Sequence, residues 1–280
     1  MNNKTYYGER NSYVNKVKLN LDVALRLFRN NIDLLIKDSY FLEATGYYCT
    51  DEGQILGIWG SDIDIFIYDK IFYEQVWPVK KYYESYTEDI LFTMVEFLFD
   101  YVSEPVNKWY HEWNSCGWHC SKYNKKLGQE RYREVMNNIL NKYGDGYILS
   151  EDGQVQKLAD TGFENLVYEK VITEDKENVD YRINSAINKF LHYKSNIDDK
   201  KGALLALFGV LEYLKTCNIK LEGKDSSDLF NIMNGFDLRH HQKVQQKDYQ
   251  KDEWYEWLFY TCLASIKLLL RLKKSELIYS

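Results

Sequence analysis

Proline is almost absent from this chain, and its scarcity constrains the fold more than any other feature of the sequence. Only Pro78 and Pro105 occur in 280 residues, and glycine is also sparse, at 15 residues. Because proline and glycine most often interrupt helices and build turns, a chain with so few of them favours long helices over a turn-rich β fold. Apolar residues make up 45% of the chain, enough to build a substantial core. The sequence therefore predicts a mainly α protein.

Apolar residues recur at helical spacing along much of the first half of the chain. Three stretches carry this pattern and are predicted helices: residues 17–37, 86–102 and 129–143. Two short β-prone runs joined by Asp152-Gly153 predict a hairpin near residues 147–158, because Asp-Gly suits a tight turn. The run Ile63–Tyr68 fits either a strand or a buried helix.

A charged stretch, Thr173–Asn178, precedes four further helical patterns joined by short polar links. We expect an N-terminal, mostly helical domain over residues 1–172 and a four-helix bundle over residues 173–280. Asp198 is the expected cap of the second helix of this bundle. The third is expected to begin near Ser226 or Ser227.

Composition also limits the partners and the compartment. A net charge of −6 argues against a broad, non-specific grip on nucleic acid, although it allows a local basic groove. The chain has no apolar run of membrane-spanning length and no apolar signal core at its N-terminus, so no membrane association is expected. Five scattered cysteines fit reduced thiols, and we expect a cytoplasmic protein.

The sequence Arg239-His240-His241 places proton-transfer groups beside a fixed positive charge. If the third helix of the bundle continues through it, His240 extends the buried stripe of Met233 and Phe236 and is a core histidine by spacing. His241 then shares a polar face with the residues that would orient it, Asn234 and Asp237.

Three lysines follow Arg239 at steps of four and would form a basic ridge able to bind an RNA backbone: Lys243, Lys247 and Lys251. The alternative is a solvated surface helix. The histidines and the guanidinium together suit metal-independent RNA cleavage, in which histidine transfers a proton and arginine stabilises charge on the phosphate. This chemistry requires no cofactor.

Three segments resemble bacterial abortive-infection proteins of the AbiJ type, in which a helical region precedes a HEPN-like domain. They are residues 40–47, 95–100 and 229–236, the last shortly before Arg239-His240-His241. The resemblance implies a phage-defence effector with a helical bundle, often a homodimer with its site at the dimer interface, and a role as a HEPN-type ribonuclease. Active members carry a histidine a few residues after the arginine, whereas here no histidine follows His241. The alternative is a non-catalytic module that binds RNA, a nucleotide or a protein partner encoded in the same defence operon.

Four residues form a group of potential metal ligands in the N-terminal region: His111, Cys116, His119 and Cys120. Zinc accepts thiolate and imidazole ligands, but the usual Cys-x₂-Cys pair is missing. Because three tryptophans crowd the same segment, the sequence favours aromatic packing around reduced cysteines, with no metal, over a structural zinc site.

The sequence Gly60-Ser61-Asp62-Ile63-Asp64 is similar to elements of minimal nucleotidyltransferases. In those enzymes a helix segment separates the Gly-Ser from the paired aspartates that hold Mg²⁺. No helix fits between Ser61 and Asp62, so we expect these aspartates to be solvated residues of a helix.

Overall fold

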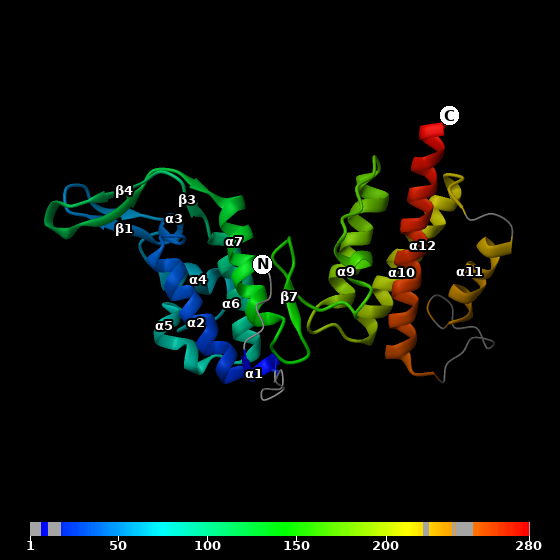
Figure 1. Ribbon diagram of the computed structural model, residues 1–280, viewed down its shortest axis with the longest axis horizontal. Helices are drawn as coiled ribbons and strands as arrows, with labels where there is room; N and C mark the ends of the chain where they lie inside the picture. The colour runs from blue at the N-terminus through cyan, green and yellow to red at the C-terminus, as the bar shows by residue number, and fades with distance from the viewer. Residues whose placement is uncertain (1–6, 11–17, 221–223, 237, 239–248, 280) are drawn as a thin grey trace. The chain divides into compact units, whose positions relative to one another are not determined.

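The computed structural model describes residues 7–10, 18–220, 224–236, 238 and 249–279 (Figure 1). The chain forms two compact units, Met1–Leu158 and Ala159–Ser280. Helices dominate both units, so the expectation of a mainly α protein is confirmed for the described part of the chain. Within that part, every helix is too short or too polar to cross a membrane.

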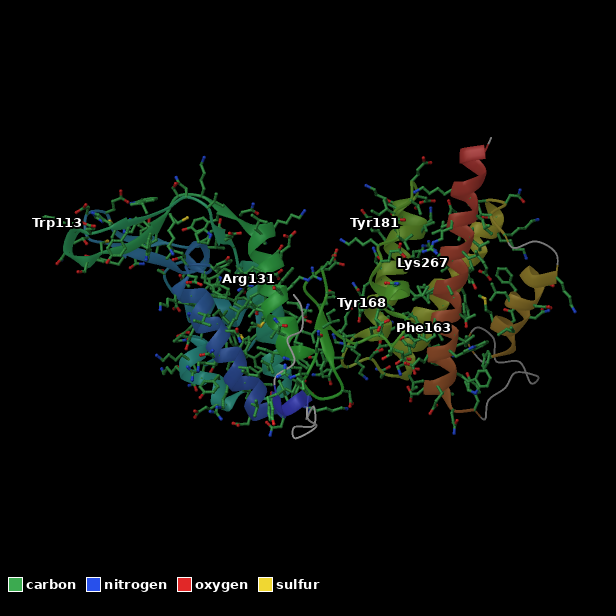
Figure 2. The ribbon with its side chains drawn as sticks, in the orientation of Figure 1. Trp113, Arg131, Phe163, Tyr168, Tyr181 and Lys267 are labelled. Atoms are coloured by element: carbon green, nitrogen blue, oxygen red, sulfur yellow. The ribbon has the colours of Figure 1, made fainter. Side chains whose placement is uncertain are left out.

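The division between the units falls at Leu158, whereas the sequence predicted a boundary at residue 172. The short helix α8 (Glu164–Tyr168) explains the difference, because it is tied to the C-terminal unit. The buried ammonium group of Lys267 donates hydrogen bonds to the carbonyl oxygens of Asn165 (2.7 Å) and Glu169 (2.9 Å), near the two ends of α8 (Figure 2).

The N-terminal unit is built on three long helices, with shorter helices around them. Its α-helices are α1 (Tyr7–Arg10), α2 (Leu21–Lys37), α3 (Leu42–Thr45), α4 (Ile63–Ile71), α5 (Val79–Tyr82), α6 (Glu88–Tyr101) and α7 (Lys125–Leu140). Its 3₁₀ turns are η1 (Tyr83–Ser85) and η2 (Trp113–Ser115). The long helices α2, α6 and α7 overlap the three predicted ranges. One apolar face is buried in α2 and α7, whereas α6 is buried on several sides.

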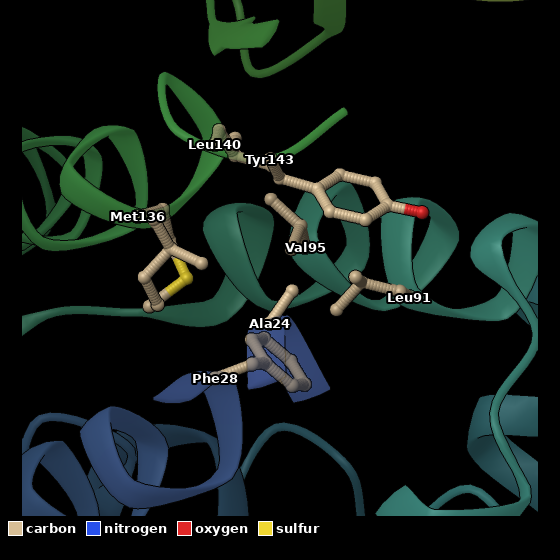
Figure 3. Close-up of a pocket in the computed structure, with 8 residues that line it drawn as sticks. Ala24, Phe28, Leu91, Val95, Met136, Leu140 and Tyr143 are labelled. Carbon is tan, nitrogen blue, oxygen red and sulfur yellow. The ribbon is translucent and has the colours of Figure 1, made fainter. Parts of the chain in front are cut away.

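The core of this unit lies between α2, α6 and α7, where Phe28, Phe92 and Tyr132 are fully buried. A small cavity of about 10 Å³ remains between the three helices, next to Val95 and Met136 (Figure 3). Apolar side chains line it, and it is about large enough for a single water molecule, so it is a packing defect rather than a ligand site.

Asp62 begins α4 as its N-cap, accepting a hydrogen bond from the backbone N–H of Ile65 (3.1 Å). The ambiguous run Ile63–Tyr68 is therefore helical, and capping accounts for Asp62 without nucleotide chemistry.

The strands of the N-terminal unit are short and pair two by two, always antiparallel. They are β1 (Gly46–Cys49) with β2 (Gly53–Leu56), β3 (Glu104–Pro105) with β6 (Tyr123–Asn124), β4 (Lys108–His111) with β5 (Gly117–Cys120), and β7 (Tyr147–Leu149) with β8 (Val155–Lys157). The hairpin β7–β8 confirms the predicted one. The hairpins β1–β2 and β4–β5 were not predicted, and they extend side by side away from the helices (Figure 1).

The C-terminal unit contains, besides α8, a π-helical turn η3 (Lys176–Asp180) and the helices α9 (Tyr181–Leu191), α10 (Ile197–Thr216), α11 (Lys224–Gly235) and α12 (Lys251–Tyr279). The central helix α10 packs against both α9 and α12. Phe190 of α9 also stacks on Phe259 of α12, with ring centroids 4.0 Å apart. Asn196, not the predicted Asp198, caps α10, in a capping box with Asp199.

The helix α11 ends at Gly235, before the position to which the sequence pattern would extend it. Phe236 and Leu238 are both buried although they lie two residues apart, a spacing that a continuing helix would place on different faces. His240 and His241, which the sequence analysis assigned to the core and to the face of Asn234 on a continuing helix, lie outside the described residues, so these assignments stay predictions.

Candidate metal centre

Two histidines and two cysteines meet between the hairpins β1–β2 and β4–β5. They are Cys49, His111, Cys116 and His119, and their ligand atoms all lie within 4.8 Å of one another. Cys49 and His119 are buried, whereas His111 and Cys116 are partly exposed. In the described part of the chain this is the one group of potential metal ligands that the fold gathers.

Strand alternation directs these side chains toward one another. Cys49 lies two residues after Tyr47 on β1, and Tyr47 contacts the ring of His119 at a centroid distance of 4.6 Å. Residues two apart on a strand share a face, so Cys49 faces β4–β5 as Tyr47 does. On β4–β5, His111 and His119 share the face that meets β1–β2, their rings 5.2 Å apart and nearly perpendicular.

Cys116 is positioned by an unusual turn rather than by a strand. The residues just before it, Asn114 and Ser115, have φ angles of 52° and 54°, and Gly117 has a φ angle of 107°. Residues other than glycine rarely adopt positive φ angles. Residues with such a strained backbone are found most often at functional sites. The turn brings the Cys116 sulfur to 3.1 Å from Nε2 of His119.

Neighbouring groups stabilise the charge that a metal ligand needs. Hydrogen bonding from the Thr50 side chain, followed by its backbone N–H (3.3 Å) and the two histidines, outweighs burial and lowers the pKa of the Cys116 thiol to about 6. The thiolate is the form that binds metal. On the other side of the cluster, Nε2 of His111 lies 3.4 Å from a carboxylate oxygen of Asp51, which leaves Nδ1 directed at Cys49 (3.9 Å).

These distances suit a tetrahedral zinc ion. With Zn–S bonds of about 2.3 Å and Zn–N bonds of about 2.0–2.1 Å, neighbouring ligand atoms lie about 3.4–3.8 Å apart. The distances Cys116–His119 (3.1 Å) and Cys49–His111 (3.9 Å) lie on either side of this range. These two distances are close to those of a zinc site, and all the other pairs of ligand atoms lie within 4.8 Å.

Three of the four ligand candidates named from the sequence belong to this cluster, and Cys120 does not. Cys120 directly follows His119 on β5, so its side chain lies on the opposite face of the strand, and its sulfur lies 3.0 Å from the carbonyl oxygen of Lys122. Cys49 replaces it. Sequence reasoning missed Cys49 because it is far from His111 along the chain; the signal that could have found it is its place at the end of a short strand before a Gly53 turn.

Most residues of the expected RNA site lie outside the described residues: Asp237, Arg239, His240, His241, Lys243 and Lys247. Asn234 is exposed in the last turn of α11, and Lys251 is exposed at the first position of α12. The cleavage-site geometry that the sequence suggested thus stays a prediction.

Comparison of the chain with models of known protein families, with curated proteins and with solved structures finds no match.

Proposed function

We propose that the N-terminal unit is a zinc-binding module in which Cys49, His111, Cys116 and His119 hold one structural zinc ion. The observation that carries the proposal is the convergence of four ligand atoms within 4.8 Å, from segments far apart in the sequence. Two thiolates and two imidazoles form a set that zinc prefers in tetrahedral geometry. Because four protein ligands complete this geometry and leave no position for a substrate, the role is structural rather than catalytic.

The stability of the hairpins supports this role. Each of β1–β2 and β4–β5 is an isolated two-stranded pair of four-residue strands. Such pairs are only marginally stable in water without further packing. A metal ion that joins Cys49 on one hairpin to His111 and His119 on the other would contribute its binding free energy to folding.

The test compares Cys49→Ser with Cys120→Ser. Full-length protein is purified without chelator, and zinc per chain is measured by inductively coupled plasma mass spectrometry. We expect about one zinc per chain in the wild type and in Cys120→Ser, and much less in Cys49→Ser. Cys120 is a matched control because it is also buried in a hairpin strand but directed away from the cluster. A wild type that takes up no zinc, even when zinc is added, contradicts the proposal.

For the C-terminal unit we propose, as a second candidate, the RNA-directed defence role that the resemblance to AbiJ and HEPN proteins implies. Its support is the sequence Arg239-His240-His241, which combines a fixed positive charge with groups that can transfer a proton. The proposed residues are Arg239 for phosphate and His240 or His241 for the proton, in a homodimer; the alternative is a non-catalytic module that binds RNA or a protein partner.

This second candidate is tested by growth inhibition and RNA integrity in cells that express the wild type, Arg239→Ala or His241→Ala. His192→Ala provides a control histidine of the same unit, outside the candidate set. We expect Arg239→Ala and His241→Ala to lose growth inhibition and RNA degradation, and His192→Ala to keep both. Equal toxicity of all four proteins would contradict the catalytic assignment. A stable complex with a second protein, with intact RNA, would favour the binding module.

A further inference from the structure

The face of hairpin β4–β5 that points away from the zinc ligands carries two aromatic rings and a lysine. Tyr110 and Trp118 are directly opposite each other in the register and therefore share a face. Lys108 shares this face, since it lies two residues before Tyr110 on β4. The histidine ligands occupy the other face, so we call Lys108, Tyr110 and Trp118 the outer face.

The two rings of the outer face are arranged but not covered, whereas Lys108 is partly buried and its ammonium group also lies 3.5 Å from the carbonyl oxygen of Asp38. The rings of Tyr110 and Trp118 meet edge to face with centroids 5.3 Å apart, and the ammonium group of Lys108 lies 4.4 Å from the Trp118 ring centre. Each ring is nonetheless 49% exposed. Trp113, in the turn at the tip of the hairpin, is 68% exposed and points away from the rest of the unit (Figure 2). These rings contribute little to the core, whereas they offer open aromatic surface to a ligand.

The local charge indicates which ligand fits. The chain as a whole is acidic, with a net charge of −6, yet the segment from Glu104 to Lys126 contains four lysines and two acidic residues. Besides Lys108, the lysines are Lys122, Lys125 and Lys126, all exposed. Exposed aromatic rings combined with lysines suit single-stranded nucleic acid, because bases stack on the rings while ammonium groups neutralise phosphates. A double helix keeps its bases inside the stack and cannot use the rings in this way.

We infer that the outer face binds single-stranded RNA, with bases stacked on Trp118 and Tyr110 and a phosphate held by Lys108. The inference rests on the proposed zinc centre, because zinc on the inner face fixes the hairpin that presents these side chains. It differs from the proposed role of Arg239, since it places an RNA contact in the N-terminal unit.

The inference is tested by fluorescence anisotropy of a labelled ten-nucleotide oligouridine with zinc-loaded, full-length protein. Trp118→Ala is expected to weaken binding about tenfold, the loss of one stacked base. Lys108→Gln is expected to reduce the dependence of the affinity on salt concentration, by the amount that about one phosphate contact contributes. Tyr48→Ala is the matched control, expected to leave affinity within about twofold. Tyr48 is an exposed tyrosine of β1 that, by alternation with Tyr47, points away from β4–β5.

Zinc content measured on the same samples separates the two proposals. A wild type that holds zinc but does not bind the RNA overturns the inference and leaves the zinc centre intact. The outer face would then be a candidate surface for a protein partner. Equal affinity for a double-stranded RNA of the same length also overturns it, as does a zinc-loaded Lys108→Gln with an unchanged salt dependence. RNA binding that depends on Trp118, in a wild type that takes up no zinc even when zinc is added, would support the outer face and overturn the zinc centre.

Discussion

Single residues decide whether the cluster can bind metal, and Cys116 is the most informative of them. Its thiol has a pKa lowered to about 6, chiefly by hydrogen bonding from Thr50. In the zinc-free protein we expect the alkylation rate of Cys116 by iodoacetamide to fall as the pH drops through about 6, because protonation removes the reactive thiolate. Mass spectrometry measures the extent of alkylation of each cysteine separately.

Zinc should abolish the reaction of Cys116 and leave Cys217, an exposed thiol of the C-terminal unit, as reactive as before. An alkylation midpoint for Cys116 near 8 to 9, the range of an unperturbed thiol, would contradict the role assigned to Thr50. Equal protection of both cysteines would show that zinc acts elsewhere.

The carboxylate of Asp51 is predicted to orient His111 from outside the ligand set. It lies 3.4 Å from Nε2 of His111, the nitrogen that does not face Cys49. Partners of this kind fix the orientation of the ring, and their loss typically lowers metal affinity 10- to 100-fold, about the loss we expect for Asp51→Ala. Competition with a chromogenic chelator measures the affinity. Glu52→Ala removes the neighbouring carboxylate and should leave affinity nearly unchanged; an equal loss in both variants would point to net charge alone.

At the scale of elements, sequence periodicity predicted the long helices of the N-terminal unit. It did not predict two hairpins whose formation depends on the backbone conformation of a few residues. The helices α2, α6 and α7 were predicted because apolar residues recur in them at helical spacing. The hairpins β1–β2 and β4–β5 have no comparable pattern, since each strand has only four residues. Their formation depends on local backbone, such as Gly46, whose φ of 70° and close approach to the carbonyl oxygen of Ile55 leave no room for a side chain.

The candidate site was predictable only in part, for the same reason. His111, Cys116 and His119 lie close in sequence and were identified as potential ligands, whereas Cys49 comes from the other hairpin. Its contribution depends on tertiary pairing that spacing does not encode. Cys120 was named from its sequence position, and the alternation of β5 excludes it.

The start of α10 provides a test of an element boundary. The side chain of Asn196 accepts a hydrogen bond from the backbone N–H of Asp199 (3.0 Å), and the side chain of Asp199 accepts one from the backbone N–H of Asn196 (3.3 Å). Asn196→Ala should therefore lower the free energy of unfolding by about 1 kcal/mol. Asp198→Ala, at the cap position expected from sequence, should cost only a few tenths of that, through the helix dipole. Urea denaturation measures both, and a larger loss in Asp198→Ala would contradict the assigned cap.

At the scale of the whole molecule, the two units have separate hydrophobic cores and are expected to respond separately to metal. The ligands all belong to the N-terminal unit, whereas α9, α10 and α12 build the core of the other. On zinc removal we expect hydrogen–deuterium exchange to accelerate in residues 46–56 and 108–120, because the hairpins lose their cross-link. Exchange in residues 181–216 should stay unchanged. Faster exchange throughout both units would contradict the independence of the cores.

The most direct test of the zinc centre is X-ray absorption at the zinc edge on the full-length, zinc-loaded protein. The proposed ligands predict two sulfur atoms at about 2.3 Å and two nitrogen atoms at about 2.0–2.1 Å from the metal. In Cys49→Ser, one sulfur atom should disappear from this shell, whereas Cys120→Ser should leave it unchanged. A shell of oxygen and nitrogen atoms without sulfur, or one with three sulfur atoms, would contradict the account.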